Sequence, residues 1–135
     1  FKRSLENHNL PRRVEYIVEG GFQEESGRAA MHLLLDLPDP PTAVIAANDI
    51  CAFGAITALG KRQLQPGKDI SIIGFDDIRL ASQWSPPLTT IRQPYREIGF
   101  MVASKLIDLI RGEDLDREII LDPRLVVRKT TGEPA

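Results

Sequence analysis

Short apolar segments alternate along this chain with longer segments that have the periodicity of a helix. The apolar segments are residues 14–20 (VEYIVEG), 42–47 (TAVIAA) and 70–73 (ISII). The helical segments are residues 24–37, 50–59 and 96–110, in which apolar side chains recur at the spacing of one helix face. Such alternation is typical of βαβ units, in which helices cover a parallel sheet. We therefore predict an α/β fold with a parallel sheet flanked by helices.

The ends of two helices are predicted from single residues. Asp49 is expected to cap the helix over residues 50–59, because a carboxylate accepts hydrogen bonds from the first backbone N–H groups. Gly60 is expected to end this helix, and Gly112 to end the helix over residues 96–110, because glycine adopts the left-handed turn that closes helices.

Weaker signals predict the remaining elements. Residues 1–8 have the pattern of a helix whose start is absent, so we expect the chain to be a piece of a longer protein. Residues 85–91 (SPPLTTI) form a turn that leads into an edge-like strand. Residues 117–122 (REIILD) and 124–129 (RLVVRK) are expected to form two final short strands.

The composition is that of a soluble globular domain and excludes several classes of protein. The chain has 135 residues, of which 42% are hydrophobic and 27% are charged. Its net charge of −2 argues against binding nucleic acid by itself, because such surfaces are usually strongly basic. The single cysteine, Cys51, excludes an internal disulfide framework and fits a reducing compartment. No apolar run approaches the length that spans a membrane.

Polar residues follow two of the predicted strands at the point where each strand ends. Asn48 and Asp49 follow the strand TAVIAA, and Asp76 and Asp77 follow ISIIG. In open parallel sheets ligands bind at the carboxyl ends of the strands, so Asn48 and Asp76 are expected to face one cavity. Phe22 follows a Gly-Gly break and supplies a flat apolar wall. Directed polar groups beside an aromatic wall predict a small-molecule pocket.

A structural role for the same residues stays open at this point. Asp and Asn after strands often serve as helix caps or turn residues, which is the role expected of Asp49. A phenylalanine in the position of Phe22 is more often simply a core residue. A ligand role for Asn48 and Asp76 is therefore one of two interpretations.

The chain shows no set of residues that indicates catalysis, a metal or a cofactor. It has no metal-ligand spacing and neither of the glycine-rich nucleotide-binding patterns. His32 falls on the polar face of its predicted helix, and His8 lies between two asparagines, so a solvated histidine and a turn residue are expected. Cys51 is expected to be a buried, inert thiol. We predict that the chain is not an enzyme.

Two aromatic residues and a helix that is apolar nearly all round predict self-association. Within residues 50–59, one apolar stripe is expected to cover the parent sheet, and a second stripe with Ile50 and Phe53 has no obvious partner. Trp84 lies in a polar, proline-flanked loop. We expect an exposed Phe53 and an exposed Trp84 at the centre of a symmetric dimer interface, with Ile50 beside them. The alternative is that both aromatic rings pack under the chain's own loops.

Several strings together resemble the C-terminal half of LacI/GalR-type bacterial transcription repressors. They are EGGFQEESG, PTAVIAANDICAFGAITAL, DISIIGFDDI, PPLTTIRQPYREIG and PRLVVR, in the order and spacing of that family. The resemblance implies a fold similar to type I periplasmic sugar-binding proteins, in which two α/β subdomains clamp a ligand. Residues 1–93 would be most of the C-terminal effector subdomain without its start. Residues 94–121 would belong to the N-terminal subdomain, and residues 122–135 would return to the C-terminal one.

The same resemblance implies roles for single residues. Asp76 and Asn48 match positions that contact an effector, usually a sugar or a purine, and Phe22 matches an aromatic that packs on it. Tyr95 matches a position that touches the ligand in some members, whereas Asp77 is expected to brace the loop. The positions that match Phe53 and Trp84 lie in the family's two-fold dimer contact.

The resemblance favours the effector-sensing and dimerising part of a cytoplasmic transcription regulator. Its partners would be a sugar-like or purine-like effector, a second copy of the chain, and operator DNA bound only through an absent N-terminal helix-turn-helix. A periplasmic or lipoprotein sugar-binding protein of the same fold is the first alternative. An enzyme on a similar α/β scaffold, such as a nucleoside or sugar hydrolase, is the second.

Overall fold

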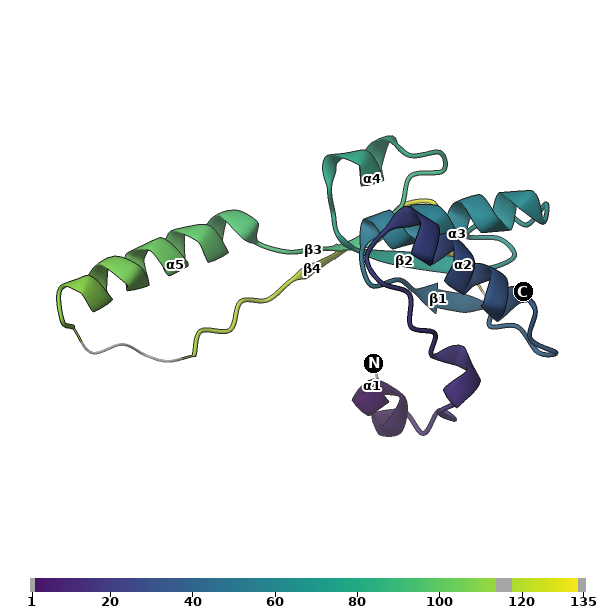
Figure 1. Cartoon of the computed structure of the whole chain (residues 1–135), viewed down its shortest axis with the longest axis horizontal. Coiled ribbons are helices and arrows are strands. Elements are labelled where there is room, and N and C mark those ends of the chain that lie inside the picture. The colour runs from purple at the N-terminus through teal and green to yellow at the C-terminus, as the bar shows by residue number, and fades with distance from the viewer. Residues whose placement is uncertain (1, 114–117, 134–135) are drawn as a thin grey trace.

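The computed structural model of the chain describes residues 2–113 and 118–133. Its centre is a four-stranded sheet in the order β1-β2-β3-β4 (Figure 1). The strands are β1 (Ala43–Ile45), β2 (Ser71–Asp76), β3 (Thr89–Arg92) and β4 (Arg124–Val126). The pairs β1–β2 and β2–β3 are parallel, and β4 runs antiparallel to β3. The predicted α/β fold with a mostly parallel sheet is confirmed.

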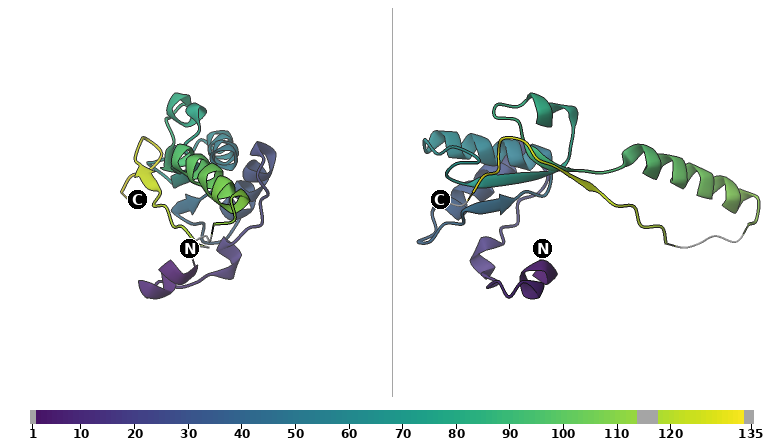
Figure 2. Two further views of the ribbon diagram at one scale, coloured as in Figure 1. Left: turned by 90° about the vertical axis from the view of Figure 1, so that its left-hand side faces the viewer. Right: turned by 180° about the vertical axis from the view of Figure 1, so that it is seen from behind.

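The helices differ in how they relate to the sheet. They are α1 (Lys2–Asn7), α2 (Glu24–Leu35), α3 (Asp49–Lys61), α4 (Arg79–Gln83) and α5 (Tyr95–Ile110), and a 3₁₀ helix spans Val14–Tyr16. α2 packs along α3, and α3 packs on β2. α5 instead projects away from the sheet at the end of two connecting segments (Figures 1 and 2). None of the residues of α5 is buried, and no helix within the described ranges has the length and apolarity needed to cross a bilayer.

α3 is the centre of the hydrophobic core because it is covered on two sides by its own chain. Its buried residues Ala52, Ala55 and Leu59 belong to one cluster with Met31 of α2 and Ile72 of β2. A helix between two layers must be apolar nearly all round, which explains its composition. From the sequence, only one of the two apolar stripes of this helix was expected to have a partner within the chain.

Phe53 is not exposed, which contradicts the expectation of two exposed aromatic rings. Its side chain is 1% exposed, and its ring stacks on Trp84 with the ring centroids 4.2 Å apart. The loop after α4 folds back over α3 and brings Trp84 to the edge of the core. Stacking of the two rings removes apolar area from water, whereas an exposed ring would leave that area hydrated. Phe53 is therefore covered within one chain.

α2 and α3 approach closely because glycines lie at their contact. A Cβ atom on Gly27 would lie 2.2 Å from the carbonyl oxygen of Cys51, and one on Gly54 would lie 2.0 Å from the carbonyl oxygen of Glu24. Neither distance is compatible with a side chain. At these two glycines the backbones of α2 and α3 are therefore in direct contact, with no side chain between them.

The expected strand at residues 14–20 is wrong. Val14–Tyr16 forms a single 3₁₀ turn, and the Tyr16 hydroxyl donates to the carbonyl oxygen of Asp39, 2.6 Å away. Arg13 forms an ion pair with the Asp39 carboxylate. These contacts tie the segment to the loop after α2, and in the described residues no strand pairs with it.

Three expectations about the other strands also need correction. β1 is an edge strand whose Ile45 is exposed, so it is not buried on both faces. β3 was expected at an edge, but β4 pairs with its free side and makes it internal. Residues 118–122 form no strand, and residue 117 lies outside the described residues. Pairing partners distant in the sequence decide each of these outcomes.

The predicted helix ends are partly confirmed. Gly112 has a φ of +78° directly after the C-cap of α5, as expected. The N-cap of α3 is Asn48 rather than Asp49, because the Asn48 side chain accepts the hydrogen bond from the Cys51 backbone N–H. Gly60 does not end α3, which continues to Lys61. Gly60 remains helical because nothing near it imposes a left-handed turn.

We predict opposite effects of alanine at two glycines of α3. Gly54→Ala should lower the free energy of unfolding by about 1–3 kcal/mol, because its Cβ collides with the backbone of α2. Gly60→Ala should raise it by about 0.5–1 kcal/mol, because its Cβ meets open space and alanine favours the helix. Urea denaturation followed by circular dichroism measures both changes. Equal changes in the two variants would show that α2 does not pack closely against Gly54.

Candidate functional site

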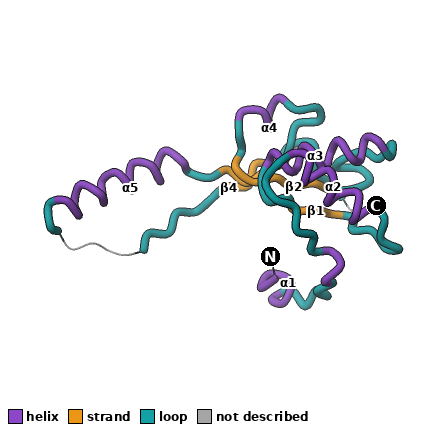
Figure 3. Tube along the Cα trace, viewed as in Figure 1, coloured by secondary structure: helices purple, strands orange, loops and turns teal. Residues whose placement is uncertain are grey.

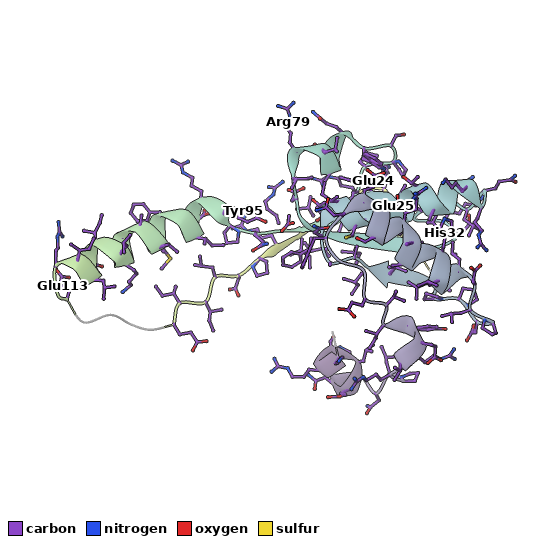
Figure 4. All side chains as sticks on the ribbon, in the orientation of Figure 1. Glu24, Glu25, His32, Arg79, Tyr95 and Glu113 are labelled. Atoms are coloured by element: carbon purple, nitrogen blue, oxygen red, sulfur yellow. The ribbon has the colours of Figure 1, made fainter. Side chains whose placement is uncertain are left out.

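Asp76 lies where β2 ends and where the connection from β3 to α5 begins. Its Oδ1 accepts hydrogen bonds from the Gln93 side-chain amide, 2.8 Å away, and from the Tyr95 hydroxyl, 2.6 Å away. Tyr95 is the first residue of α5 and lies at the end of that helix nearest the sheet (Figure 4). The three side chains form a polar cluster that links the sheet to the projecting helix. The structure thus brings Asp76 and Tyr95 together.

Asn48 holds the start of α3 against the loop that carries Phe22. Its Oδ1 accepts from the Cys51 backbone N–H at 2.8 Å, and its Nδ2 donates to the Phe22 carbonyl oxygen at 3.1 Å. Both ends of the amide therefore have a partner within the chain. The interpretation of Asn48 as a cap is correct, and its amide also fixes the position of Phe22.

Phe22 is a surface residue, not a core residue. Its side chain is 68% exposed, although the backbone on both sides is held in place. Cys51 donates its thiol hydrogen bond toward Gly21, with Sγ 3.3 Å from the carbonyl oxygen. Burial raises the pKa of the Cys51 thiol, and the expected burial of this cysteine is confirmed. The loop is therefore anchored while the aromatic ring is left available.

Asp49 is fully buried and connects three elements. Its carboxylate accepts the hydroxyl of Thr90 in β3 and the backbone N–H of Ile78, the latter at 2.8 Å. A Cβ on Gly74 of β2 would lie 2.3 Å from Asp49 Oδ1, so only glycine fits there. Burial raises the pKa of Asp49 despite these hydrogen bonds. The carboxylate fixes the start of α3 relative to the loop that follows Asp76.

Asp77 is an ion-paired residue, as its expected bracing role requires. Its carboxylate accepts from the guanidinium groups of Arg92 and Arg128. Burial alone would raise the pKa of Asp77, but the hydrogen bonds from Arg128 and Arg92 outweigh it and hold the pKa below its usual range. Adjacent acids in the sequence therefore have different environments: Asp77 is paired with cations, whereas Asp76 contacts neutral donors.

Several residues that build this site were not predicted from the sequence. Thr90, Arg92, Gln93 and Arg128 were read only as parts of strands or of family strings. Their partners lie at least 15 residues away in the sequence, so no local pattern identifies them. The run of polar residues after β3 was the one available signal.

The described residues contain no metal-binding cluster. No group of three or more His, Cys, Asp or Glu side chains among them is placed to hold an ion. His32 lies on α2, far from Tyr95 and the end of the sheet (Figure 4). The site is instead suited to hydrogen bonding and to packing on a flat ring.

We predict that Tyr95 stays protonated at pH 10. The hydrogen bond to Asp76 raises the pKa of Tyr95 to about 12, so only about 1% ionises at pH 10. Asp76→Asn removes the charge that holds the phenol proton, and roughly half should then ionise because the ordinary pKa is about 10. Ultraviolet absorbance of tyrosinate measures this in a Tyr16→Phe background, which leaves Tyr95 as the single tyrosine. Equal ionisation with and without Asp76→Asn would show that the hydrogen bond is absent in solution.

Comparisons with known proteins place this chain in a family. The model of the periplasmic binding protein-like domain family matches residues 1–131. The transcriptional repressor PurR of the HTH type from Photorhabdus laumondii is 42% identical over 131 residues, which cover 96% of this chain and 38% of the repressor. The chain thus spans less than half the length of this relative.

Solved structures agree with the sequence comparison. The lac repressor dimer bound to operator and an anti-inducer matches with a TM-score of 0.88 and 34% identity, over 98% of this chain and 46% of that one. A LacI-family transcriptional regulator from Enterococcus faecium with bound ribose matches with a TM-score of 0.86 and 33% identity, over 98% and 49%. These relatives are transcriptional regulators and not enzymes, so the enzyme alternative is not supported. The chain therefore belongs to the LacI family of transcriptional regulators, in which it is part of the effector-binding, periplasmic-binding-protein-like domain.

Proposed function

We propose that the end of the sheet around Asp76 binds a small effector with a sugar-like or purine-like ring. The observation that carries the proposal is the orientation of the Asp76 carboxylate. In the described part of the chain both hydrogen bonds to Asp76 reach Oδ1, which leaves Oδ2 for a hydroxyl or N–H group of a ligand. Such a carboxylate accepts either two neighbouring hydroxyls or the N–H groups of a base.

Phe22 and Tyr95 complete the proposed site. The exposed ring of Phe22 suits stacking on a flat base or on the apolar face of a sugar. Tyr95 orients Asp76 and lies at the edge of the site. Asn48 acts mainly by fixing the Phe22 loop, because its amide already bonds to backbone groups on both sides. The bound ribose of the Enterococcus faecium relative supports a sugar-sized ligand.

The projecting helix supports a ligand site between two subdomains. α5 exposes a wide apolar surface, including Phe100, Leu106 and Ile110, and the described residues of its two connecting segments form loops (Figure 3). We infer that residues 94–121 belong to a second subdomain that faces Asp76. The relatives, which are about twice as long as this chain, support this division.

We further propose a symmetric dimer formed through α3 and the Trp84 loop. An open, mostly apolar hollow of about 560 Å³ lies there, lined by Ile56, Thr57, Gly60, Trp84 and Pro86, among others. Trp84 would form the centre, with Phe53 supporting it from below and Ile50 beside it. The lac repressor relative, which is a dimer, supports the assignment.

In the proposed function, the bound effector controls whether the protein binds its operator DNA. The HTH type of the PurR relative and the operator-bound lac repressor support DNA binding through a separate N-terminal segment. The net charge of −2 agrees with that separation, because a net negative charge does not favour binding to the phosphates of DNA. A regulator of transcription in bacteria acts in the cytoplasm.

We predict that Asp76→Ala abolishes the effector response of the intact protein. Loss of a charged hydrogen-bond partner costs about 1.5–3 kcal/mol, which is roughly tenfold or more in affinity. Calorimetric titration with hypoxanthine, guanine and D-ribose first identifies which probe binds and then measures the loss. Glu25→Ala, which removes an exposed acid of α2 outside the site, is the matched control. Unchanged affinity in Asp76→Ala would refute the assignment of Asp76.

We predict a dimer that depends on the hollow beside Trp84. Sedimentation should give a mass near twice the 15.0 kDa of the chain. Gly60→Arg should return it to a monomer, because the long side chain fills the hollow while its Cβ meets open space in the single chain. Gly60→Ala should remain a dimer and serves as the control. A monomeric parent chain, or a dimeric Gly60→Arg variant, would contradict the proposed interface.

A further inference from the structure

Asp77 directly follows β2 and contacts one residue of β3 and one residue just after β4. Arg92 is the last residue of β3 and precedes the segment that leads to α5, while Arg128 lies beyond the end of β4. Both guanidinium groups donate to Asp77, Arg92 to Oδ2 and Arg128 to Oδ1. Figure 1 shows that β3 and β4 lie side by side and that the chain runs from β3 to α5. One buried carboxylate therefore joins the end of β2 to the end of β3 and to the residues after β4.

We propose that Asp77, Arg92 and Arg128, hereafter the clamp, position Asp76 for ligand binding. The proposal rests on the function proposed above for Asp76. The clamp does not touch the ligand; it fixes the backbone from which the Asp76 side chain leaves. Arg128 is its main cation and Arg92 its minor one.

The backbone of the two acids needs such support. Asp76 has a φ of +120° and Asp77 a φ of +55°. L-residues are disfavoured in this region, and they persist there only when their surroundings hold them. The ion pairs hold Asp77 from one side, and the bond from the Ile78 N–H to Asp49 holds the chain from the other. Without the clamp, relaxation toward negative φ would move Asp76 away from Tyr95.

The two cations of the clamp are not equivalent. The side chain of Arg128 is 15% exposed, and it also donates to the carbonyl oxygen of Leu88. The side chain of Arg92 is 58% exposed, so water and salt screen its ion pair. The side chain of Asp77 is only 4% exposed, and loss of its buried partner would leave a carboxylate without compensation. Arg128 should therefore matter much more than Arg92.

The ionisation of Tyr95 at pH 10 tests the clamp without any ligand. In the Tyr16→Phe background, Arg128→Gln should raise the ionised fraction of Tyr95 from about 1% toward one half, because Asp76 no longer reaches the phenol. The direction is diagnostic, since removal of a nearby positive charge by itself would suppress tyrosinate. Arg92→Gln should leave the fraction nearly unchanged. Asp36→Asn, which breaks an exposed ion pair with Arg62 between the ends of α2 and α3, is the control.

Circular dichroism must show that each variant is folded at pH 10. Asp77→Asn, which keeps the shape of the side chain, is the second variant and should free Tyr95 as well. A folded Arg128→Gln or Asp77→Asn variant in which Tyr95 stays as protonated as in the parent would overturn the proposal. An effect of Arg92→Gln as large as that of Arg128→Gln would overturn the assignment of Arg128 as the main cation.

A second measurement separates this proposal from the proposed function. Affinity for the probe that binds, hypoxanthine, guanine or D-ribose, is compared in the intact protein between Arg128→Gln and Asp76→Ala. We expect about a tenfold loss or more in both. If Arg128→Gln frees Tyr95 while Asp76→Ala binds normally, the clamp stands and the ligand role of Asp76 fails. If Asp76→Ala loses binding while Arg128→Gln changes neither readout, the ligand role stands and the clamp fails.

Discussion

The buried carboxylate of Asp49 fixes the relation between the core helix and the site. It is inaccessible to solvent and accepts hydrogen bonds from Thr90 of β3 and from the Ile78 backbone. A buried acceptor that lost these donors would be costly, so the start of α3 has one position relative to the sheet. Asn48 precedes Asp49 and Ile78 follows the two acids of the loop. The positions of the Phe22 loop and of Asp76 therefore both depend on the hydrogen bonds of Asp49.

The core supports that arrangement through close packing rather than size. Gly27 and Gly54 let α2 touch α3, and Gly74 lets α3 approach β2 closely enough for Asp49 to be buried. Covering of α3 on both sides leaves its apolar residues little free surface. The Trp84 loop closes over Phe53 and becomes the outermost apolar layer. A dimer contact on this side would therefore be made through Trp84 and the hollow beside it.

The two adjacent acids at the end of β2, Asp76 and Asp77, differ in the residues that they contact. Asp77 points to two arginines and is nearly buried, so its charge is used within the chain. Among the described residues, the side chain of Asp76 contacts only the neutral donors of Gln93 and Tyr95, and both reach Oδ1. The left-handed backbone at both residues aims the two carboxylates at different partners. Structural bracing by Asp77 thus lies next to the recognition proposed for Asp76, and a change in one is expected to affect the other.

Local patterns were sufficient for the class of fold and for the longer helices. Apolar periodicity identified α2, α3 and α5, because a helix face repeats within a few residues, and the apolar run before Gly74 identified β2. Pairing and burial were different, because they depend on residues far apart in the sequence. Whether residues 14–20 form a strand, or which of Asn48 and Asp49 caps α3, depends on partners such as Asp39 and Thr90. Only the folded chain brings Arg128 to Asp77 across 51 residues, since ion pairs and close packing act over ångströms in space and leave no local pattern in the sequence.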